Sequence, residues 1–195
     1  MINYDDKFLH QFIKTYNVVD KDICNRCIKN VEQSDLWQEH TFYDEVDKKA
    51  FKESGKDELS VLYYDLCLGK EKKIIMDLIW NTLQKYFNDI DTPWFTGWTG
   101  YTAIRFNKYK KNKKMAPHCD HIQTIFDGTI RGIPFLSIVG CLNDNYSGGE
   151  FIMFDDKEYK IKAGQILIFP SSFMFPHKVN PVTKGIRYSY VSWVY

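Results

Sequence analysis

Apolar residues recur at helical spacing in two stretches of the N-terminal half of the chain. The first stretch follows Asp20, a residue typical of an N-cap, and predicts a helix over residues 21–34. Its apolar positions are Ile23, Cys24, Cys27, Ile28 and Val31. The second stretch runs from Lys70 to Phe87, with an apolar stripe on one side and lysines and acids on the other. Both helices are expected to pack as supports against a sheet.

The remainder of the N-terminal half has weaker patterns. Residues 1–19 predict an amphipathic lead-in, either helix or strand, and the aromatic residues between Trp37 and Tyr43 predict a strand. A loop is expected to end at residues 54–57, and the apolar run 59–68 fits a strand or a helix. The first 93 residues are therefore expected to form a helical and mixed support.

From Trp94 onward the pattern changes to short apolar or alternating runs separated by turn residues. The expected strands cover Trp98–Tyr109, Phe135–Leu142, Glu150–Phe154, Tyr159–Ile161, Ile166–Phe169 and Ile186–Tyr195. Many short strands with turn signals predict a β-sandwich or barrel. No linker or repeat divides the chain, so residues 1–195 are expected to form one α+β, β-dominated domain with its strand-rich part at 94–195.

Composition and charge narrow the class of protein. The chain has 195 residues, 44% of them hydrophobic and 16% aromatic, which is enough for a substantial core. A formal charge of +1 provides no global field for nucleic acid. No apolar run approaches the roughly 20 residues that span a bilayer, and the acidic N-terminus lacks a signal core. A cytoplasmic protein without a membrane partner is therefore expected.

The five cysteines are irregularly spaced and do not indicate a disulfide framework. Cys24 and Cys27 have a spacing found in zinc and redox sites, but no second pair of that spacing follows to close a zinc site. Their helical periodicity favours the simpler interpretation, two small apolar residues on one face of a helix.

The candidate chemistry begins with the triplet His118-Cys119-Asp120. On a strand, alternate residues face the same side, so His118 and Asp120 can both point inward while Cys119 points away. His177, from a distant strand, would complete a set of two imidazoles and one carboxylate, which suits a non-haem Fe(II) oxygenase. Taken singly, each histidine is better explained as a loop or turn residue beside a proline.

Arg187 is a candidate anchor for an acidic co-substrate. Alternation places it on one face with Ser189, Val191 and Trp193, and the last two are expected to be buried. A buried guanidinium needs a partner, and its own strand carries no acid, which favours an exogenous carboxylate held bidentately. The alternative is a surface arginine after a glycine turn.

An ordered set of residues extends these signals through the second half of the chain. It consists of Tyr109, His118, Asp120, Leu142-Asn143, Gly148-Gly149-Glu150, Gly164, Phe169-Pro170-Ser171, His177, Pro181-Val182-Thr183, Gly185, Arg187 and Trp193. In order and spacing this set resembles the catalytic core of the Fe(II)/2-oxoglutarate-dependent oxygenases, and within them the prolyl-4-hydroxylase-like branch. The resemblance covers roughly Trp98 to Tyr195, half of the chain.

The resemblance implies a double-stranded β-helix (jelly-roll) core with the N-terminal helices packed outside. His118, Asp120 and His177 would bind Fe(II), and Arg187 would hold the distal carboxylate of 2-oxoglutarate. With O2, and with ascorbate as a supporting reductant, such an enzyme would hydroxylate a C–H bond and release succinate and CO2. The first expectation for the substrate is a prolyl residue in a protein or peptide.

The resemblance also assigns further residues to the pocket. Tyr109 is expected to contact 2-oxoglutarate, with Ser189 and Thr183 as weaker candidates, and Trp193 is expected to line the substrate groove. Plain aromatic residues of a strand or core are the alternatives for Tyr109 and Trp193.

One position departs from the family pattern. Many members of this branch carry a tyrosine just before the position of Leu142, where this chain has Gly140, so the co-substrate pocket is expected to be completed differently there. Residues 122–134, which include Arg131, are expected to form a loop over the entrance that sets substrate choice.

The lysines at positions 108, 110, 111, 113 and 114 are most simply a solvated loop. The alternative is a rim for an acidic peptide or for a nucleic-acid backbone, and in the second case the same chemistry would act on a base. A free small molecule as substrate, or a jelly-roll binding module without turnover, are further alternatives.

Overall fold

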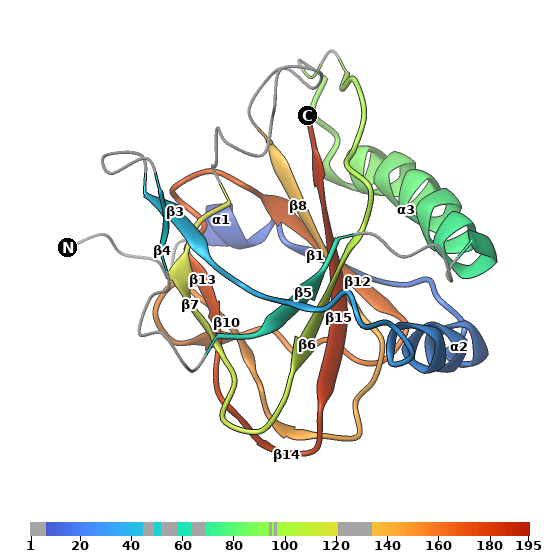
Figure 1. Cartoon of the computed structure of the whole chain (residues 1–195). Helices are drawn as coiled ribbons and strands as arrows, with labels where there is room; N and C mark the ends of the chain where they lie inside the picture. The colour runs from blue at the N-terminus through green and yellow to red at the C-terminus, as the bar shows by residue number, and fades with distance from the viewer. Residues whose placement is uncertain are drawn as a thin grey trace.

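The computed structural model describes residues 7–44, 49–51, 58–63, 69–93, 95, 97–120 and 134–195. In this part of the chain two antiparallel sheets pack against a shared apolar layer, and two helices cover the other side of the larger sheet (Figure 1). The described structure is therefore dominated by β-strands, with its helices outside the sandwich, as the sequence predicts.

The larger sheet has seven strands among the described residues, in the spatial order β1-β12-β8-β15-β6-β5-β2. Their bounds are β1 Lys14–Asn17, β12 Gln165–Pro170, β8 Leu136–Cys141, β15 Arg187–Val194, β6 Arg105–Tyr109, β5 Ser60–Leu62 and β2 Gln38–Glu39. Strands β8 and β15 are buried along their whole length because both of their faces are covered. The centre of this sheet is consequently the most enclosed part of the fold.

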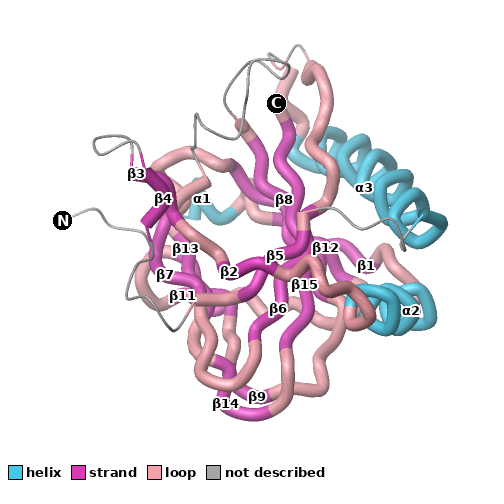
Figure 2. Tube along the Cα trace, viewed as in Figure 1, coloured by secondary structure: helices cyan, strands magenta, loops and turns pink. Residues whose placement is uncertain are grey.

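The smaller sheet has the order β11-β10-β13-β7, and two further strand pairs are β14-β9 and β3-β4 (Figure 2). The bounds are β11 Lys157–Glu158, β10 Phe151–Met153, β13 His177–Val179, β7 Met115–His118, β14 Val182–Lys184, β9 Ser147–Gly148, β3 Phe42–Asp44 and β4 Lys49–Phe51. These strands are short, so packing against the larger sheet rather than long ladders holds them in place.

Two apolar cores lie on opposite faces of the larger sheet. The core between the two sheets includes Val139, Leu167 and Val191 from the larger sheet and Met153 and Val179 from the smaller one. The second core joins the other face of the larger sheet to the helices. It includes Ile138, Ile166, Ile168, Tyr188, Tyr190, Cys24, Cys27, Val31, Ile75, Ile79 and Leu83. The predicted supporting role of both helices is confirmed.

The two predicted helices are α2 (Lys21–Val31) and α3 (Gly69–Ile90). Helix α2 begins after Asp20, whose carboxylate accepts a hydrogen bond of 2.7 Å from the backbone N–H of Asp22, as an N-cap does. It ends at Val31, three residues before the predicted limit. The lead-in before it contains one helical turn, α1 (Lys7–His10), and the edge strand β1.

Cys24 and Cys27 are fully packed in the helix-facing core, with exposed fractions of 1% and 0%. Burial raises the pKa of their thiols to about 11 and about 12, so both stay protonated at neutral pH. Neither belongs to a metal-ligand cluster in the described part of the chain. The interpretation as two apolar residues on one helix face is confirmed.

Some strand predictions are wrong in position. The strand expected over Tyr159–Ile161 lies instead at Lys157–Glu158, because a tight turn with positive φ at Phe154 and Asp155 brings the chain back two residues earlier. The long strand expected from Trp98 is reduced to β6, since its first residues bond to the C-terminal end of β15 as an irregular segment. No pattern predicts the bounds of β7, β13, β9 or β14, although His118 and His177 are expected on strands and lie on β7 and β13.

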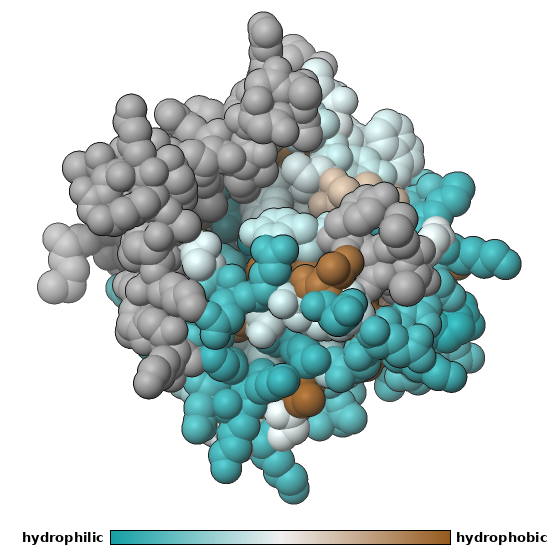
Figure 3. Space-filling model, in the orientation of Figure 1, coloured by the Kyte–Doolittle hydropathy of each residue, from teal (hydrophilic) through white to brown (hydrophobic). Residues whose placement is uncertain are grey.

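No helix in the described ranges is both long and apolar enough for a membrane crossing. The face shown in Figure 3 is hydrophilic over its lower part, where hydrophobic residues appear only as separate spots.

Candidate metal and co-substrate site

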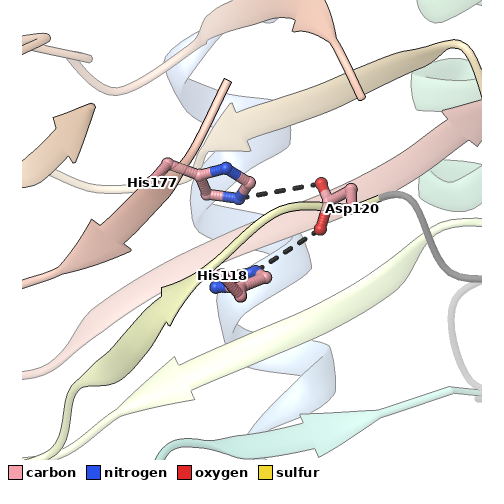
Figure 4. Close-up of side chains that lie close together, drawn as sticks. All are labelled: His118, Asp120 and His177. Atoms are coloured by element: carbon pink, nitrogen blue, oxygen red, sulfur yellow. Dashed lines mark ion pairs between the residues drawn. The ribbon is translucent and has the colours of Figure 1, made fainter. Parts of the chain in front are cut away.

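Two histidines and one aspartate converge between the sheets. His118 is the last residue of β7, Asp120 follows it by two positions, and His177 is the first residue of β13. Strand β13 pairs with β7 so that His177 and His118 are direct neighbours in the ladder. The side chains point toward one another (Figure 4), and their ligand atoms all lie within 4.8 Å of each other.

Both imidazoles present Nε2 to the same carboxylate. Nε2 of His118 lies 3.4 Å from Oδ1 of Asp120, and Nε2 of His177 lies 3.7 Å from Oδ2 of Asp120. On the other side of each ring, Nδ1 is bonded to a backbone carbonyl, that of Ala116 at 2.8 Å and that of Phe175 at 3.2 Å. A proton on Nδ1 therefore donates to the backbone and leaves the Nε2 lone pair for a metal, as is usual for metal-binding histidines.

The electrostatics of the triad suit a divalent cation. Burial alone would raise the pKa of Asp120, but the neighbouring His177 and His118 and the Ser137 hydroxyl outweigh it and lower the pKa well below its ordinary value. Burial, with His118 close by, lowers the pKa of His177 to about 4. At neutral pH Asp120 is therefore ionised and His177 is neutral, the forms that coordinate metals.

Aromatic residues enclose the His177 ring. Phe151 stacks on it with ring centroids 5.3 Å apart, and Phe169 meets it edge-on at 4.9 Å. The two phenylalanines come from different sheets, so this ring is clamped from both sides of the sandwich. Such packing fixes the ring orientation and keeps water away from it.

Arg187 lies in the same pocket at the start of β15. It is 2% exposed, its guanidinium carbon is 4.8 Å from the ring centroid of Tyr109, and its Nη1 donates to Oγ of Ser189 at 3.0 Å. Its Nε has no hydrogen-bond partner in the described part of the chain. None of the ion pairs among the described residues includes Arg187. The guanidinium thus keeps donors for a carboxylate that the described protein does not provide.

The pocket gathers most of the predicted site residues. Its lining includes Tyr109, His118, Asp120, His177, Arg187, Ser189 and Trp193. The space left between these side chains is about 30 Å³. This is about the volume of one water molecule, so a bound diacid requires some lining side chains to change rotamer.

The structure places the other predicted residues elsewhere. Thr183 is exposed on β14 and is not among the residues lining the pocket. Arg131 and most of the expected entrance loop lie outside the described residues. Lys108 is buried on β6 with its Nζ 2.6 Å from a carboxylate oxygen of Glu32, so it does not contribute to a basic rim.

Gly140, where many family members have a tyrosine, does not leave a gap in the co-substrate pocket as the sequence analysis expected. Gly140 faces the helices, and a Cβ there would lie 1.9 Å from a ring carbon of Tyr190. A side chain at this position could not reach the co-substrate pocket. The inward-facing neighbour that lines the pocket is Val139, and Cys141 is the next residue on that side.

Tyr146, which the sequence did not indicate, completes the surroundings of Arg187. It is close enough for its phenol to interact with the guanidinium and with the Cys141 thiol, 4.0 Å from its hydroxyl. Burial raises the pKa of Tyr146 to about 12, so it stays a neutral hydrogen-bond donor. Gly149, with φ of +67°, makes room beside it, since a Cβ there would lie 3.2 Å from Cδ of Arg187.

Comparison with known proteins supports the predicted family. Residues 104–195 match the family model described as the 2OG-Fe(II) oxygenase superfamily. Over this segment, slightly less than half of the chain, the sequence is similar to that superfamily, as its motifs predict. Fe(II), 2-oxoglutarate and O2 are features of the family, and the His118, Asp120 and His177 cluster is the corresponding candidate metal site.

Two bacterial relatives each match slightly less than half of the chain. A PKHD-type hydroxylase of Idiomarina loihiensis is 31% identical over 94 residues, which are 47% of this chain and 41% of the relative. A PKHD-type hydroxylase of Xylella fastidiosa is 34% identical over 107 residues, 46% of this chain and 43% of the relative. The matched segment thus spans less than half the length of these relatives.

Solved structures share the fold over nearly the whole chain. A prolyl hydroxylase of Trichoplax adhaerens, in complex with a hypoxia inducible factor peptide fragment, has a TM-score of 0.68 at 15% identity and covers 95% of this chain and 84% of its own. The viral collagen prolyl hydroxylase of Paramecium bursaria Chlorella virus-1 has a TM-score of 0.64 at 13% identity, with 94% of each chain covered. The described sheets are therefore those of an oxygenase double-stranded β-helix.

Proposed function

We propose that this oxygenase is an Fe(II)- and 2-oxoglutarate-dependent dioxygenase that hydroxylates a prolyl residue in a protein or peptide and releases succinate and CO2. The observation that carries the proposal is the meeting, in one pocket, of a two-histidine, one-carboxylate cluster with a buried arginine. That donor set with open positions suits a non-haem Fe(II) centre.

The residues present fit the metal. His118 and His177 offer Nε2 atoms whose rings are oriented by backbone carbonyls, and Asp120 offers both carboxylate oxygens between them. The bound Fe(II), together with 2-oxoglutarate and O2, supplies the oxidising chemistry. The protein contributes fixed ligands and a pocket closed by aromatic and aliphatic side chains, which exclude water from the reacting centre.

The co-substrate would be held by groups of the larger sheet. Arg187 would bind the distal carboxylate of 2-oxoglutarate, because a guanidinium fork matches a carboxylate and no acid among the described residues occupies it. Tyr109 lies against the guanidinium and Ser189 accepts a bond from it, so both would orient the fork. The Tyr146 phenol stands near the same group and could donate to the same carboxylate.

The proposal of a prolyl substrate is supported by the lining of the pocket and by the structural neighbours. Trp193 lines the pocket with the triad, where a flat apolar ring can pack on a pyrrolidine. Two of the neighbours in fold are named as prolyl hydroxylases, and one of them is in complex with a peptide. A prolyl residue within a peptide is therefore the substrate tested first.

The test is turnover with proline-rich peptides in the presence of Fe(II), 2-oxoglutarate and ascorbate. The expected products are a peptide that has gained one oxygen atom, seen by mass spectrometry, and an equal amount of succinate. His177→Ala, which removes one metal ligand, should abolish both. Succinate without hydroxylated peptide across a broad panel would contradict the prolyl assignment, and no succinate at all would contradict the dioxygenase.

A further inference from the structure

We propose that Arg105, Asn107 and Trp193 form a second anion-binding subsite in this pocket, which takes a carboxylate carried by the substrate. The inference rests on the proposed function, because it names a property of the molecule that is hydroxylated. It differs in location from the co-substrate anchor, since Arg187 occupies the opposite end of the same strand pair.

The register of β6 against β15 separates the two arginines. Arg187 is opposite Tyr109, while Arg105 is opposite Val191. Arg105 and Tyr109 are four positions apart on one strand, about 13 Å at the usual rise, and they face the same side. Both arginines line the cavity that contains the triad, so it has a buried guanidinium toward each end.

Several observations place the candidate metal ligands near the end of the pocket that Arg105 lines. Ser137, whose hydroxyl contacts the Asp120 carboxylate, is opposite Trp193 in the ladder of β8 and β15. The guanidinium carbon of Arg105 lies 5.0 Å from the Trp193 ring centroid and 5.8 Å from that of Tyr63. Tyr63 is 55% exposed, so Arg105 lies where the pocket approaches the surface.

The guanidinium of Arg105 forms no ion pair with the described residues. Its side chain is nearly buried, with an exposed fraction of 9%, and no ion pair in the described part of the chain includes it. The buried Glu58 carboxylate accepts instead from the backbone N–H of Ala116 at 3.2 Å and lies 3.7 Å from His40. An unpaired buried cation is costly, which favours a ligand that supplies the negative charge.

The neighbours of Arg105 add donors. Its Nε donates to Oδ1 of Asn107 at 3.2 Å, so Nδ2 is the donor that this amide can offer to a ligand. Nε1 of Trp193 is buried without a hydrogen-bond partner in the described structure. Guanidinium edges, an amide N–H and an indole N–H are all donors, and a group of this kind favours an anion over a neutral polar group.

The small free volume decides between anions. The pocket leaves about 30 Å³ between its side chains, so a flat carboxylate fits with less rearrangement than a tetrahedral phosphate. The carboxylate could be that of a free or C-terminal residue, or the side chain of an acidic residue beside the proline. We therefore expect this enzyme to prefer substrates with a carboxylate close to the oxidised carbon.

The experiment compares paired probes that differ only in that charge. N-acetyl-L-proline and N-acetyl-L-prolinamide test a terminal carboxylate, and peptides with Pro-Glu or Pro-Gln test a side chain. Equilibrium binding is followed by tryptophan fluorescence in wild-type protein, in Arg105→Met and in the matched control Lys110→Met, an exposed residue just beyond β6. Binding of 2-oxoglutarate is measured separately, in the presence of metal and without O2.

Wild-type protein and Lys110→Met should bind one of the two acidic probes about tenfold to a hundredfold tighter than its neutral partner, the range for a charge-assisted hydrogen bond. Arg105→Met should lose this preference and keep its affinity for 2-oxoglutarate, and Arg105→Lys, a check if the methionine variant does not fold, should retain part of the preference. Equal binding of acidic and neutral probes by wild-type protein would overturn the inference, as would a loss of 2-oxoglutarate affinity in place of the preference. Because the readout is binding, it stands apart from the turnover test of the proposed function.

Discussion

Replacing Arg187 by methionine separates co-substrate binding from stability. The guanidinium is 2% exposed, its Nη1 donates to Ser189, and it also interacts with the phenol of Tyr146. Truncating one partner of a buried, hydrogen-bonded charge pair costs about 2–5 kcal/mol of binding free energy. The dissociation constant for 2-oxoglutarate is therefore expected to rise about 30-fold to 4000-fold.

The same substitution should leave the ligand-free protein as stable as before. Methionine fills a similar volume and removes a buried cation that has no carboxylate partner among the described residues, a change that is often neutral or stabilising. The lost cation–π contact with Tyr109 costs about 2 kcal/mol at such a desolvated site, and removal of the unpaired buried cation offsets it. The free energy of unfolding without ligand is therefore expected to change by less than about 1 kcal/mol.

Denaturant unfolding with and without 2-oxoglutarate measures both quantities. At a concentration 100 times the wild-type dissociation constant, the ligand should stabilise wild-type protein by about 2.7 kcal/mol. With affinity reduced at least 30-fold, the same concentration should stabilise Arg187→Met by less than about 1 kcal/mol. Equal ligand stabilisation in both proteins would refute the anchor, and a strongly destabilised ligand-free variant would show that Arg187 serves the fold instead.

Three further substitutions test the surroundings of the pocket. Gly149→Ala should cost about 1–2 kcal/mol of unfolding free energy, because φ is +67°, and should raise the KM for 2-oxoglutarate more than it lowers kcat by crowding Arg187; an unchanged KM would contradict this packing. Gly140→Ala should destabilise by about 3 kcal/mol or more by denaturant unfolding, since its Cβ meets Tyr190, and Tyr190→Leu in the same chain should recover much of the loss if the clash is the cause. The pKa of the Glu32 carboxyl is lowered, because the ammonium and phenol that donate to it outweigh its partial burial. The stabilisation that the ionised Glu32 carboxylate gives the folded protein is present above the unfolded pKa of about 4.3 and is lost as pH falls through the lower folded pKa. The difference in unfolding free energy between wild type and Glu32→Gln should therefore be largest at neutral pH and shrink in acid. A difference that does not depend on pH would exclude this linkage.

The residues that the sequence placed correctly are those whose positions follow from local geometry. His118 and Asp120 share a side because they are two positions apart, and Arg187 shares a face with Ser189 and Trp193 for the same reason. The helix stripes and the Asp20 cap are local in the same sense. Patterns of this kind need no knowledge of which strands pair.

Contacts between distant segments do not follow from such local patterns. His177, which the sequence predicts as the third ligand, meets His118 only because β13 pairs with β7, and strands this short do not reveal that pairing. Tyr146 belongs to a turn, whose position is fixed by the end of β8 and by Gly149 rather than by any periodicity. A glycine pattern can indicate that such a turn exists, but it does not say which side chain the turn delivers to the pocket.

The sequence prediction that position 140 lines the co-substrate pocket is wrong because of a shift of one residue along the strand. Counting back from a motif places a residue near the pocket, but a shift of one position moves its side chain to the opposite face of the sheet. Here that face belongs to the helices, where the Tyr190 ring occupies the space that a side chain at 140 would need. Gly140 therefore leaves room for the Tyr190 ring in the core between the larger sheet and the helices.

The packing between the two sheets matters for the site because each sheet carries a different part of it. The metal-ligand candidates come from β7, the residues just after it and β13, all at the smaller sheet, whereas Arg187 and Arg105 stand on β15 and β6 of the larger one. The distance from the candidate ligands to either guanidinium is therefore set by the apolar layer between the sheets and not by either sheet alone. Because close-packed interiors yield little to strain, that layer holds both guanidiniums at fixed positions relative to the three candidate ligands. The helices behind the larger sheet then serve chemistry as well as stability, since they fix the plane on which both arginines stand.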